Sequence, residues 1–265
     1  MTNTSMLADI AESLDNAERG RTAISPLTES TPDLSVEDAY AIQAAWLERR
    51  LAHGAGTADR LVGRKVGLTN RAMQRQLGVD EPDFGFLLQS MLRRSGATLV
   101  ASELIQPRVE PEIAFWLERP LRGPGITRAD VLAATHGVSA ALEIVDSRIA
   151  DWRIKLVDTI ADNGSSSRAV ISEQIISAAD LDLGAETVRL FTNDNEVGLG
   201  SGADVLGHPA EAVAWLANCL ADFDSQLDAG HVVLPGAMCA SVFAHAGEMF
   251  RAEFAHLGAV EVRFA

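Results

Sequence analysis

The stretch Val109-Glu-Pro-Glu-Ile-Ala-Phe-Trp116 carries the strongest structural and chemical signal in this sequence of 265 residues. Its apolar end predicts a deeply placed strand, on which Glu110 and Glu112 share one face, about 7 Å apart along the chain. Two like charges near a core are costly unless a cation lies between them. With no His or Cys nearby, oxygen ligands favour Mg²⁺ or Mn²⁺, and Ca²⁺ less so. The alternative is an acidic pair that faces outward from an edge strand.

A second acidic segment, Ala140-Ala-Leu-Glu-Ile-Val-Asp146, strengthens the metal interpretation. It places Glu143 in the middle of an apolar strand, where an unpaired carboxylate is rarely found. Three carboxylates from two strands, Glu110, Glu112 and Glu143, can occupy one side of an octahedral metal ion and leave its other positions to water and substrate. We therefore predict that these three residues bind the metal.

Lysine is scarce, because only Lys65 and Lys155 among the 22 basic residues are lysines. Arginine keeps its proton in proteins, so chemistry that needs a removable proton favours a lysine. Lys65 lies in the predicted strand Leu61–Leu68, where an apolar setting near a metal would disfavour the ammonium form and suit proton transfer. The alternative is a lysine whose stem packs while its head reaches water. Lys155 is either a charge near the site or a surface residue.

A third polar segment, Asp158-Thr-Ile-Ala-Asp-Asn-Gly-Ser-Ser-Ser-Arg168, has two interpretations. It is either a polar turn with a helix cap or a loop that presents hydroxyls and an amide to a polar substrate. The spacing of its residues does not decide between the two.

Composition limits the classes of partner. The net charge of −15 argues against nucleic acid and anionic membrane surfaces, because both select a basic patch. No apolar run approaches the roughly 20 residues of a membrane helix, and the first residues lack a signal-peptide pattern. Cys219 and Cys239 lie in no metal-binding motif, so we expect reduced thiols in a cytoplasmic protein.

The pattern of apolar residues predicts an α+β fold with a helical N-terminal region over residues 1–60 and a catalytic domain over residues 61–265. No Gly-rich dinucleotide or phosphate-binding motif follows the first strand, so a nucleotide-binding fold is not supported. Glu81–Gly85 is expected to be a turn-rich loop. The predicted helices are Met6–Leu14, Ser35–Arg50, Arg71–Leu77, Thr127–Thr135 and Pro209–Asp222, and the predicted strands are Leu61–Leu68, Ile105–Leu117, Val138–Val145, Val188–Thr192, His231–Leu234 and Ala259–Phe264.

Several motifs together resemble those of the 2-oxopent-4-enoate hydratases and 4-oxalocrotonate decarboxylases of the fumarylacetoacetate hydrolase superfamily. The resemblance runs from about Ser35 to the end of the chain, and the combination is specific where each motif alone is not. The motifs are Gly63-Arg-Lys-Val-Gly-Leu-Thr69 with Pro82-Asp-Phe-Gly85, Gln106-Pro-Arg-Val-Glu-Pro-Glu-Ile-Ala-Phe115, Glu143-Ile-Val-Asp-Ser-Arg-Ile149 with the Asp158 segment, and Leu206-Gly-His-Pro209.

The resemblance implies a fumarylacetoacetate hydrolase-like fold, in which a mixed, twisted β-sheet roll carries the metal site beside a helical N-terminal region. It implies a divalent metal on the same three glutamates that the spacing favours. It also implies that Lys65 is the acid/base and that Asp83 and Ser165 line the pocket.

For activity, the resemblance implies hydration of 2-hydroxypenta-2,4-dienoate (2-oxopent-4-enoate) or an alkyl homologue to a 4-hydroxy-2-oxo acid, in the meta-cleavage breakdown of aromatic or steroid compounds. The alternative is decarboxylation of 4-oxalocrotonate (2-oxohex-3-enedioate), for which Arg168 is a candidate to receive the second carboxylate. The segments Trp215-Leu-Ala-Asn218 and Val233-Leu-Pro-Gly236 resemble the hydratases more closely. A non-catalytic member of the family is disfavoured, because a scaffold has no need of a buried charge cluster.

The resemblance also implies assembly, since the family's members are oligomers and often pentamers of dimers. We expect a homo-oligomer, or a complex with the pathway's decarboxylase or aldolase. Two segments depart from the family pattern: Gly164 replaces a usual alanine, and Ala237-Met-Cys239 replaces small or hydroxyl residues. If the second segment contacts substrate, the pocket is more apolar than usual and accepts a longer alkyl dienoate.

Overall fold

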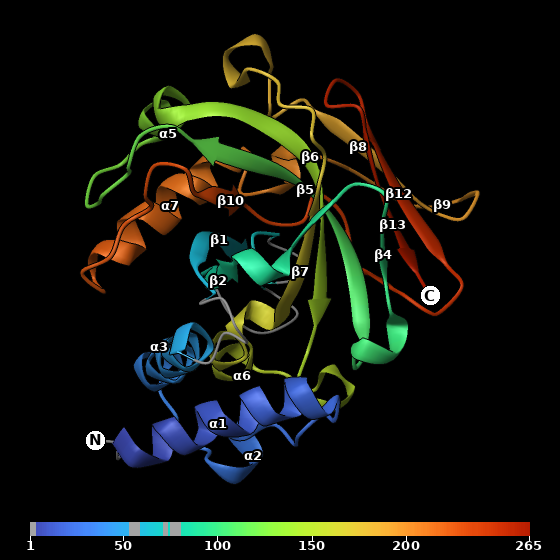
Figure 1. The fold of residues 1–265 in the computed structure, drawn as a ribbon. Coiled ribbons are helices and arrows are strands. Elements are labelled where there is room, and N and C mark those ends of the chain that lie inside the picture. Colours follow the sequence, from blue (N-terminus) through green and yellow to red (C-terminus); the bar gives the residue numbers. More distant parts are fainter. Residues whose placement is uncertain (1–3, 53–58, 71–73, 75–80) are drawn as a thin grey trace.

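The computed structural model describes residues 4–52, 59–70, 74 and 81–265, which form two sheets and a group of helices (Figure 1). The larger sheet contains, in spatial order, β2 (Asp83–Leu88), β1 (Leu61–Gly67), β10 (Val232–Leu234), β5 (Pro107–Leu117), β6 (Thr135–Asp146), β7 (Ser166–Ile171) and β3 (Leu92–Arg94), with β11 (Val242–Phe243) also paired to β5. The smaller sheet contains β4 (Ala97–Leu99), β13 (Ala259–Phe264), β12 (Met249–Phe254), β8 (Thr187–Thr192) and β9 (Asn195–Ser201). The helices are α1 (Thr4–Gly20), α2 (Leu27–Ser30), α3 (Val36–Ala52), α5 (Arg128–Ala134), α6 (Leu156–Ala161) and α7 (Pro209–Ala221).

The antiparallel pair β5 and β6 lies at the centre of the larger sheet. Its register runs from Pro107 opposite Asp146 to Leu117 opposite Thr135. Both strands are strongly curved in Figure 1, and β6 also contacts β12 and β13 of the smaller sheet. A core of aliphatic and aromatic side chains joins the two sheets to α5 and α7. The predicted α+β fold, a curled mixed sheet with helices at its N-terminal end, is confirmed.

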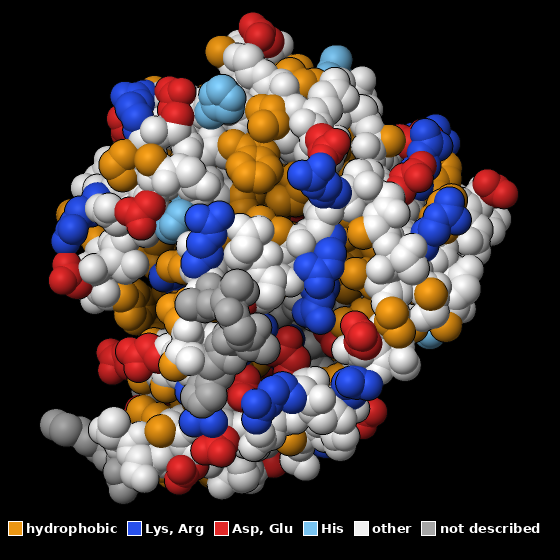
Figure 2. All heavy atoms as spheres, in the orientation of Figure 1, with side chains coloured by type: hydrophobic (Ala, Val, Ile, Leu, Met, Phe, Trp, Pro, Cys, Tyr) orange, Lys and Arg blue, Asp and Glu red, His pale blue; other side chains and the backbone are white. Residues whose placement is uncertain are grey.

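Helices α1, α2, α3 and α6 gather at one end of the molecule, at the bottom of Figure 1. Figure 2 shows acidic and basic side chains interspersed on the surface of this end. Their apolar side chains share a second core with the larger sheet, in which Trp46 of α3 packs edge-on against Phe86 of β2. The Trp46 indole also donates a hydrogen bond to Asp15 of α1 (3.1 Å). The helical region therefore rests directly on the sheet, and its boundary at residue 60 stays a prediction.

The elements predicted from periodicity are mostly confirmed, with ends that differ by a few residues. Helix α3 begins where its capping box predicts, because Asp38 N donates to Ser35 Oγ (3.1 Å) and Ser35 N donates to Asp38 Oδ2 (3.1 Å). The helix predicted over Arg71–Leu77 lies outside the described residues, apart from Gln74. None of the described helices is long and apolar enough to cross a membrane.

The expectation of a loop over Glu81–Gly85 is wrong for its second half, because β2 begins at Asp83. In the antiparallel pairing of β2 with β1, Asp83 lies opposite Gly67. This pairing and the burial of the whole strand outweigh the local turn preference of Pro, Asp and Gly. The pairing also brings Asp83 to the same end of the sheet as Lys65.

Candidate metal and active site

Three glutamates meet on the central strand pair. Glu110 of β5 lies directly opposite Glu143 of β6, and Glu112 follows two residues later on the same face of β5. One oxygen from each carboxylate lies within 4.8 Å of the other two. Glu112 and Glu143 are fully buried, whereas Glu110 is partly exposed.

The protein supplies few hydrogen-bond donors to these carboxylates. Glu112 Oε2 accepts a bond from Gly236 N (2.7 Å), but Glu112 Oε1 and both oxygens of Glu143 accept none from the described residues. Burial, and next the charge of Glu143, raises the pKa of Glu110 to about 7, and the same causes raise the pKa of Glu112 well above its usual range. Buried carboxylate oxygens without partners fit a divalent cation that takes oxygen ligands.

Lys65 projects from β1 toward the three carboxylates. Its Nζ lies 3.5 Å from Glu143 Oε2 and donates a hydrogen bond to the carbonyl of Gly164 (3.0 Å). The residue is only 3% exposed, so its head does not reach bulk water. Burial lowers the pKa of Lys65, but Glu143, Asp83 and the other two glutamates outweigh it and raise the pKa above the ordinary lysine value. The ammonium form is thus favoured, opposite to the sequence expectation, because the four carboxylates around Lys65 outweigh its burial.

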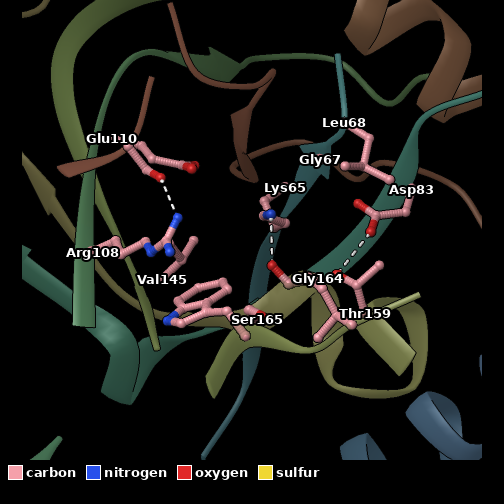
Figure 3. A pocket seen from close by; sticks show the side chains of 13 residues that line it. Lys65, Gly67, Leu68, Asp83, Arg108, Glu110, Val145, Thr159, Gly164 and Ser165 are labelled. Atoms are coloured by element: carbon pink, nitrogen blue, oxygen red, sulfur yellow. Dashed lines mark hydrogen bonds between the residues drawn. The ribbon is translucent and has the colours of Figure 1, made fainter. Parts of the chain in front are cut away.

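Asp83 lies across the cavity from Glu110 in Figure 3. Its Oδ2 accepts a hydrogen bond from Thr159 Oγ1 (3.2 Å), and its Oδ1 has no hydrogen-bond partner among the described residues. Burial raises the pKa of Asp83, and the charge of Lys65 opposes this rise. A Cβ atom on Gly67 would lie 2.1 Å from Asp83 Oδ1, so glycine at this position leaves the space that the carboxylate occupies.

Ser165 ends a tight turn between α6 and β7. The backbone is left-handed at three successive residues, with φ of 60° at Asn163, 56° at Gly164 and 55° at Ser165. This conformation costs energy in residues other than glycine, so surrounding contacts must hold the turn. The turn directs the Gly164 carbonyl to Lys65. The segment Asp158–Arg168 is therefore a helix end, a supporting turn and a strand start rather than a free loop.

A buried ion pair holds this turn in place. Arg148 Nε donates to Asp162 Oδ1 (2.6 Å), and both residues are fully buried. Asp162 Oδ2 accepts a hydrogen bond from Ser165 Oγ (2.9 Å). On the other side, Asn163 accepts from the backbone N–H of Phe86 (2.7 Å) and donates to the carbonyl of that residue (3.1 Å). The turn is thus fixed to β2 and to the segment after β6.

These groups border one cavity of about 180 Å³ (Figure 3). All three residues that the sequence predicts as catalytic line it, and so does Glu110, whereas Glu112 and Glu143 are buried and do not line it. The residues that line the cavity are Lys65, Gly67, Leu68, Asp83, Arg108, Glu110, Val145, Trp152, Ile154, Thr159, Gly164, Ser165 and Ser241.

A second cavity of about 200 Å³ shares Glu110 with the first and extends along residues 237–240. Cys239 and two alanines of this loop line it, so the loop that departs from the family pattern does border the site. Met238 does not line it, because this residue is 1% exposed and packs in the core. Selection of a longer alkyl substrate by this loop would therefore depend on residues other than Met238.

Two cations considered from the sequence lie away from the first cavity. Arg168 lies in a separate surface hollow with Arg50, and its Nη1 is 3.9 Å from Glu18 Oε1 of α1. The expectation that Arg168 receives a substrate carboxylate is wrong, because packing against α1 directs its guanidinium to that hollow. Lys155 is exposed and is a surface residue.

Sequence reasoning assigned no role to several residues that line the cavity, among them Arg108, Trp152 and Ser241. Strand alternation could have indicated Arg108, because it stands two residues before Glu110 on β5 and so lies on the same face as Glu110 and Glu112. Trp152 and Ser241 come from irregular segments, whose approach to the site depends on tertiary contacts and leaves no local pattern.

Comparisons with known proteins agree with this architecture. Residues 53–265 match the family described as fumarylacetoacetate (FAA) hydrolase C-terminal. The chain is 44% identical over 266 residues to the 2-hydroxyhexa-2,4-dienoate hydratase of Comamonas testosteroni, which covers 100% of this chain and 99% of that protein. It is also 46% identical over 219 residues to the 2-hydroxypent-2,4-dienoate hydratase of Pseudomonas putida. This match covers 82% of this chain and 97% of that protein.

Among solved structures, the chain resembles 4-oxalocrotonate decarboxylase from Pseudomonas putida G7, complexed with magnesium and adipate. The TM-score is 0.96 at 34% identity, and the match covers 100% of this chain and 99% of that chain. The family match, the curated relatives and the fold agree with the motifs noted in the sequence. The chain belongs to the fumarylacetoacetate hydrolase family.

Proposed function

We propose that this protein is a divalent-metal-dependent hydratase that adds water to 2-hydroxypenta-2,4-dienoate or an alkyl homologue. The product is a 4-hydroxy-2-oxo acid. The observation that carries the proposal is the meeting of three carboxylates with the buried ammonium of Lys65 beside one cavity. The hydratase names of relatives at 44% and 46% identity support the same class of reaction.

Glu110, Glu112 and Glu143 are the residues that would hold the metal, with Mg²⁺ or Mn²⁺ as the expected ion. Their unpartnered oxygens and the raised pKa values of two of them fit a cation with oxygen ligands. When bound, the ion supplies Lewis-acid stabilisation of the negative charge that develops on the 2-oxygen of the substrate. A structural relative at 34% identity is complexed with magnesium, which supports this choice.

The reaction requires two proton relocations and one water molecule. As the dienol becomes a ketone, the 2-hydroxyl loses its proton and C5 gains one. The resulting 2-oxo-3-enoate then adds water, so that C4 gains the hydroxyl and C3 gains a proton. Every proton is therefore returned to substrate or solvent, and no covalent nucleophile is needed.

Three side chains of the cavity suit these transfers. Lys65 holds a proton at Nζ, oriented by the Gly164 carbonyl and Glu143. Asp83 presents an unpartnered oxygen that can accept a proton from water and return it. The Ser165 hydroxyl donates to a neighbouring carboxylate, so its oxygen remains available as an acceptor toward the cavity.

Decarboxylation of 4-oxalocrotonate is the second candidate function. It is favoured by the likeness to the solved decarboxylase, at a TM-score of 0.96. Such a reaction would use the same three carboxylates but a substrate with a second carboxylate. The hydratase is preferred because the curated relatives at 44% and 46% identity are named hydratases, whereas the solved decarboxylase is 34% identical.

One pair of assays tests both functions. The purified protein is incubated with Mg²⁺ or Mn²⁺ and enzymatically generated 2-hydroxypenta-2,4-dienoate, and loss of the dienoate absorbance is followed. A parallel reaction contains 2-oxohex-3-enedioate, with release of CO₂ monitored. Turnover of the first substrate alone, abolished by EDTA, is the expected result. CO₂ release from the second establishes the decarboxylase instead, and no turnover of either by the metal-loaded protein overturns both.

The proposal extends to assembly and location. We infer a homo-oligomer, with a pentamer of dimers as the expected form, in the cytoplasm, and contact with a pathway decarboxylase or aldolase. Val197 (41% exposed) and Leu199 (67% exposed) lie on β9, the edge strand of the smaller sheet, and such exposed apolar edges favour pairing with another chain. Light scattering during size-exclusion chromatography, with and without the partner enzymes, measures the assembly, and a monomer at micromolar concentration would contradict it.

A further inference from the structure

The guanidinium of Arg108 lies at the wall of the first cavity. Arg108 stands two residues before Glu110 on β5, so both side chains project from the same face of the strand. The guanidinium carbon lies 4.6 Å from the ring centroid of Trp152 and 4.0 Å from that of Phe243. Figure 3 shows Arg108 beside Glu110, with its nitrogen atoms directed into the cavity. Two aromatic rings therefore pack against the group, and its N–H groups can still donate hydrogen bonds.

Among the described residues, the guanidinium of Arg108 has few hydrogen-bond partners. Arg108 Nη1 makes one long bond to Ser241 Oγ (3.4 Å). Its Nε is buried and has no partner among the described residues. A guanidinium carries five N–H donors in a planar fork that matches the two oxygens of a carboxylate. The unused donors at a cavity wall thus point to an anionic ligand.

The backbone that carries Trp152 is also unusual. Asp151 and Trp152 both have left-handed conformations, with φ of 59° and 54°, which cost energy in residues other than glycine. The Trp152 indole donates a hydrogen bond to the carbonyl of Gln106 (3.1 Å), two residues before Arg108. A strained turn thus places the Trp152 ring against the guanidinium of Arg108. Such strain is expected where the orientation of the guanidinium is important for binding a ligand.

We infer that Arg108 binds the carboxylate of the substrate that adjoins the 2-oxygen, and so fixes the direction in which the substrate lies. The inference rests on the proposed function and adds a binding residue to it. Arg108 adjoins Glu110, and the C1 carboxylate and 2-oxygen are the substrate groups expected near the metal ligands. Lys65 and Asp83 would exchange protons with the carbon chain. In Figure 3, Lys65 lies in the middle of the view and Asp83 lies on the side opposite Arg108. With C1 at Arg108, the carbon chain extends toward these two residues.

The opposite assignment, in which Arg108 binds a distal carboxylate, makes a different prediction for ligands that have no distal group. Pyruvate has the carboxylate and the 2-oxygen and ends there. 2-Oxoglutarate has the same two groups and a distal carboxylate. Comparison of the two ligands therefore identifies which end Arg108 contacts.

The experiment is calorimetric titration of the Mg²⁺-loaded protein with pyruvate and with 2-oxoglutarate. Loss of a charge-assisted, two-point contact in Arg108→Gln is expected to weaken pyruvate binding by roughly ten- to a hundredfold, and 2-oxoglutarate binding by the same factor. Arg108→Lys keeps the charge but not the fork, so we expect an intermediate loss. Arg153→Gln is the matched control, because Arg153 follows Trp152 in sequence but pairs with Glu29 on the surface.

The outcomes separate this inference from the function on which it rests. Weaker binding of 2-oxoglutarate alone would assign Arg108 to the distal end and overturn the inference, as would unchanged binding of both ligands. Thermal melting and Mg²⁺ titration of each variant show that it is folded and metal-competent, so a loss of pyruvate binding is due to the lost contact. A wild-type protein that binds neither ligand and also turns over no 2-hydroxypenta-2,4-dienoate would overturn the proposed function itself. A wild-type protein that turns over the dienoate but binds neither ligand would overturn only the inference about Arg108.

Discussion

Glu110 and Glu143 face each other directly across the β5–β6 pair, where like charges are unfavourable neighbours. Burial and the proximity of Glu143 raise the pKa of Glu110 to about 7, because both disfavour its charged form. Lys65 offsets part of the charge at 3.5 Å from Glu143, and one ammonium cannot neutralise three carboxylates. The fold therefore holds three mutually repelling carboxylates together, and a divalent cation would reduce their repulsion. The thermal stability of the protein with and without the cation tests this account.

Replacement of Glu112 by glutamine separates stability from metal binding. Gln keeps an oxygen for the Gly236 N–H and removes an ionisable group whose charged form is disfavoured by burial and by the other two glutamates. We expect the variant to have a higher melting temperature than the wild type in EDTA, by roughly 2–4 °C for each 1 kcal/mol added to the free energy of unfolding. We also expect Mg²⁺ to raise the melting temperature of the wild type but not that of the variant. Differential scanning calorimetry with and without Mg²⁺ measures both effects.

The control for that variant is Glu118→Gln, since Glu118 is exposed and outside the cluster. It should leave both melting temperatures within about 1 °C of the wild type, because surface substitutions are usually close to neutral. A lower melting temperature of Glu112→Gln in EDTA would contradict the account of the cluster as a destabilising charge conflict.

The two lysines of the chain form a matched pair for testing proton transfer. Lys65→Met removes the buried ammonium beside Glu143, and Lys155→Met removes an exposed one. We expect kcat for dienoate hydration to fall by roughly 10²–10⁴-fold in the first variant and to remain unchanged in the second. Mg²⁺ affinity should be kept or increased in Lys65→Met, because a competing positive charge is removed. Steady-state kinetics and Mg²⁺ titration give both values, and retention of kcat by Lys65→Met would exclude this residue as the acid/base.

The metal cluster was predictable because its signal is local. Strand alternation brings Glu110 and Glu112 to one face, and apolar neighbours mark Glu143 as buried. Alternation does not reveal which strands are paired, so the direct opposition of Glu110 and Glu143 required the structure. The family motifs supplied Asp83 and Ser165, which no periodicity distinguishes from ordinary turn residues.

The two arginines near the motifs show where sequence reasoning fails. Arg168 and Arg108 are each adjacent to a candidate site segment, and nothing in their local sequence says which one reaches the cavity. Arg168 is drawn to Glu18 of α1, and Arg108 is held between two rings from distant segments. Both placements result from tertiary packing. A prediction from local sequence therefore considered Arg168 and overlooked Arg108, which lines the cavity.

The buried pair of Arg148 and Asp162 should be the main support of the Ser165 turn. Asp162→Ala leaves a buried guanidinium without its carboxylate, and removal of one partner of such a pair typically costs about 3–5 kcal/mol. We expect the free energy of unfolding to fall by this amount and hydration to be impaired, because the turn loses its anchor. Urea unfolding at constant Mg²⁺ measures the change.

An exposed ion pair serves as the comparison. Glu173→Gln breaks the surface pair with Arg94 and should change the free energy of unfolding by less than about 1 kcal/mol. Ser165→Ala, which keeps the buried pair but removes one hydrogen bond to Asp162, should cost about 1–3 kcal/mol, less than Asp162→Ala, and should lower kcat. Equal unfolding free energies for Asp162→Ala and Glu173→Gln would refute the supporting role of the buried pair.

Gly67→Ala tests whether the spacing of the catalytic side chains is required. The added Cβ would lie 2.1 Å from Asp83 Oδ1 and 3.2 Å from Lys65 Nζ, so the carboxylate must move away from its position. Because catalysis depends on placement of acid and base groups to within a fraction of an ångström, we expect kcat to fall by about a hundredfold. Mg²⁺ affinity should change little, since neither displaced group is a proposed ligand. Gly20→Ala, where a Cβ would meet nothing within 4 Å, should retain full activity. Wild-type kcat in Gly67→Ala would show that Asp83 need not occupy its observed position during turnover.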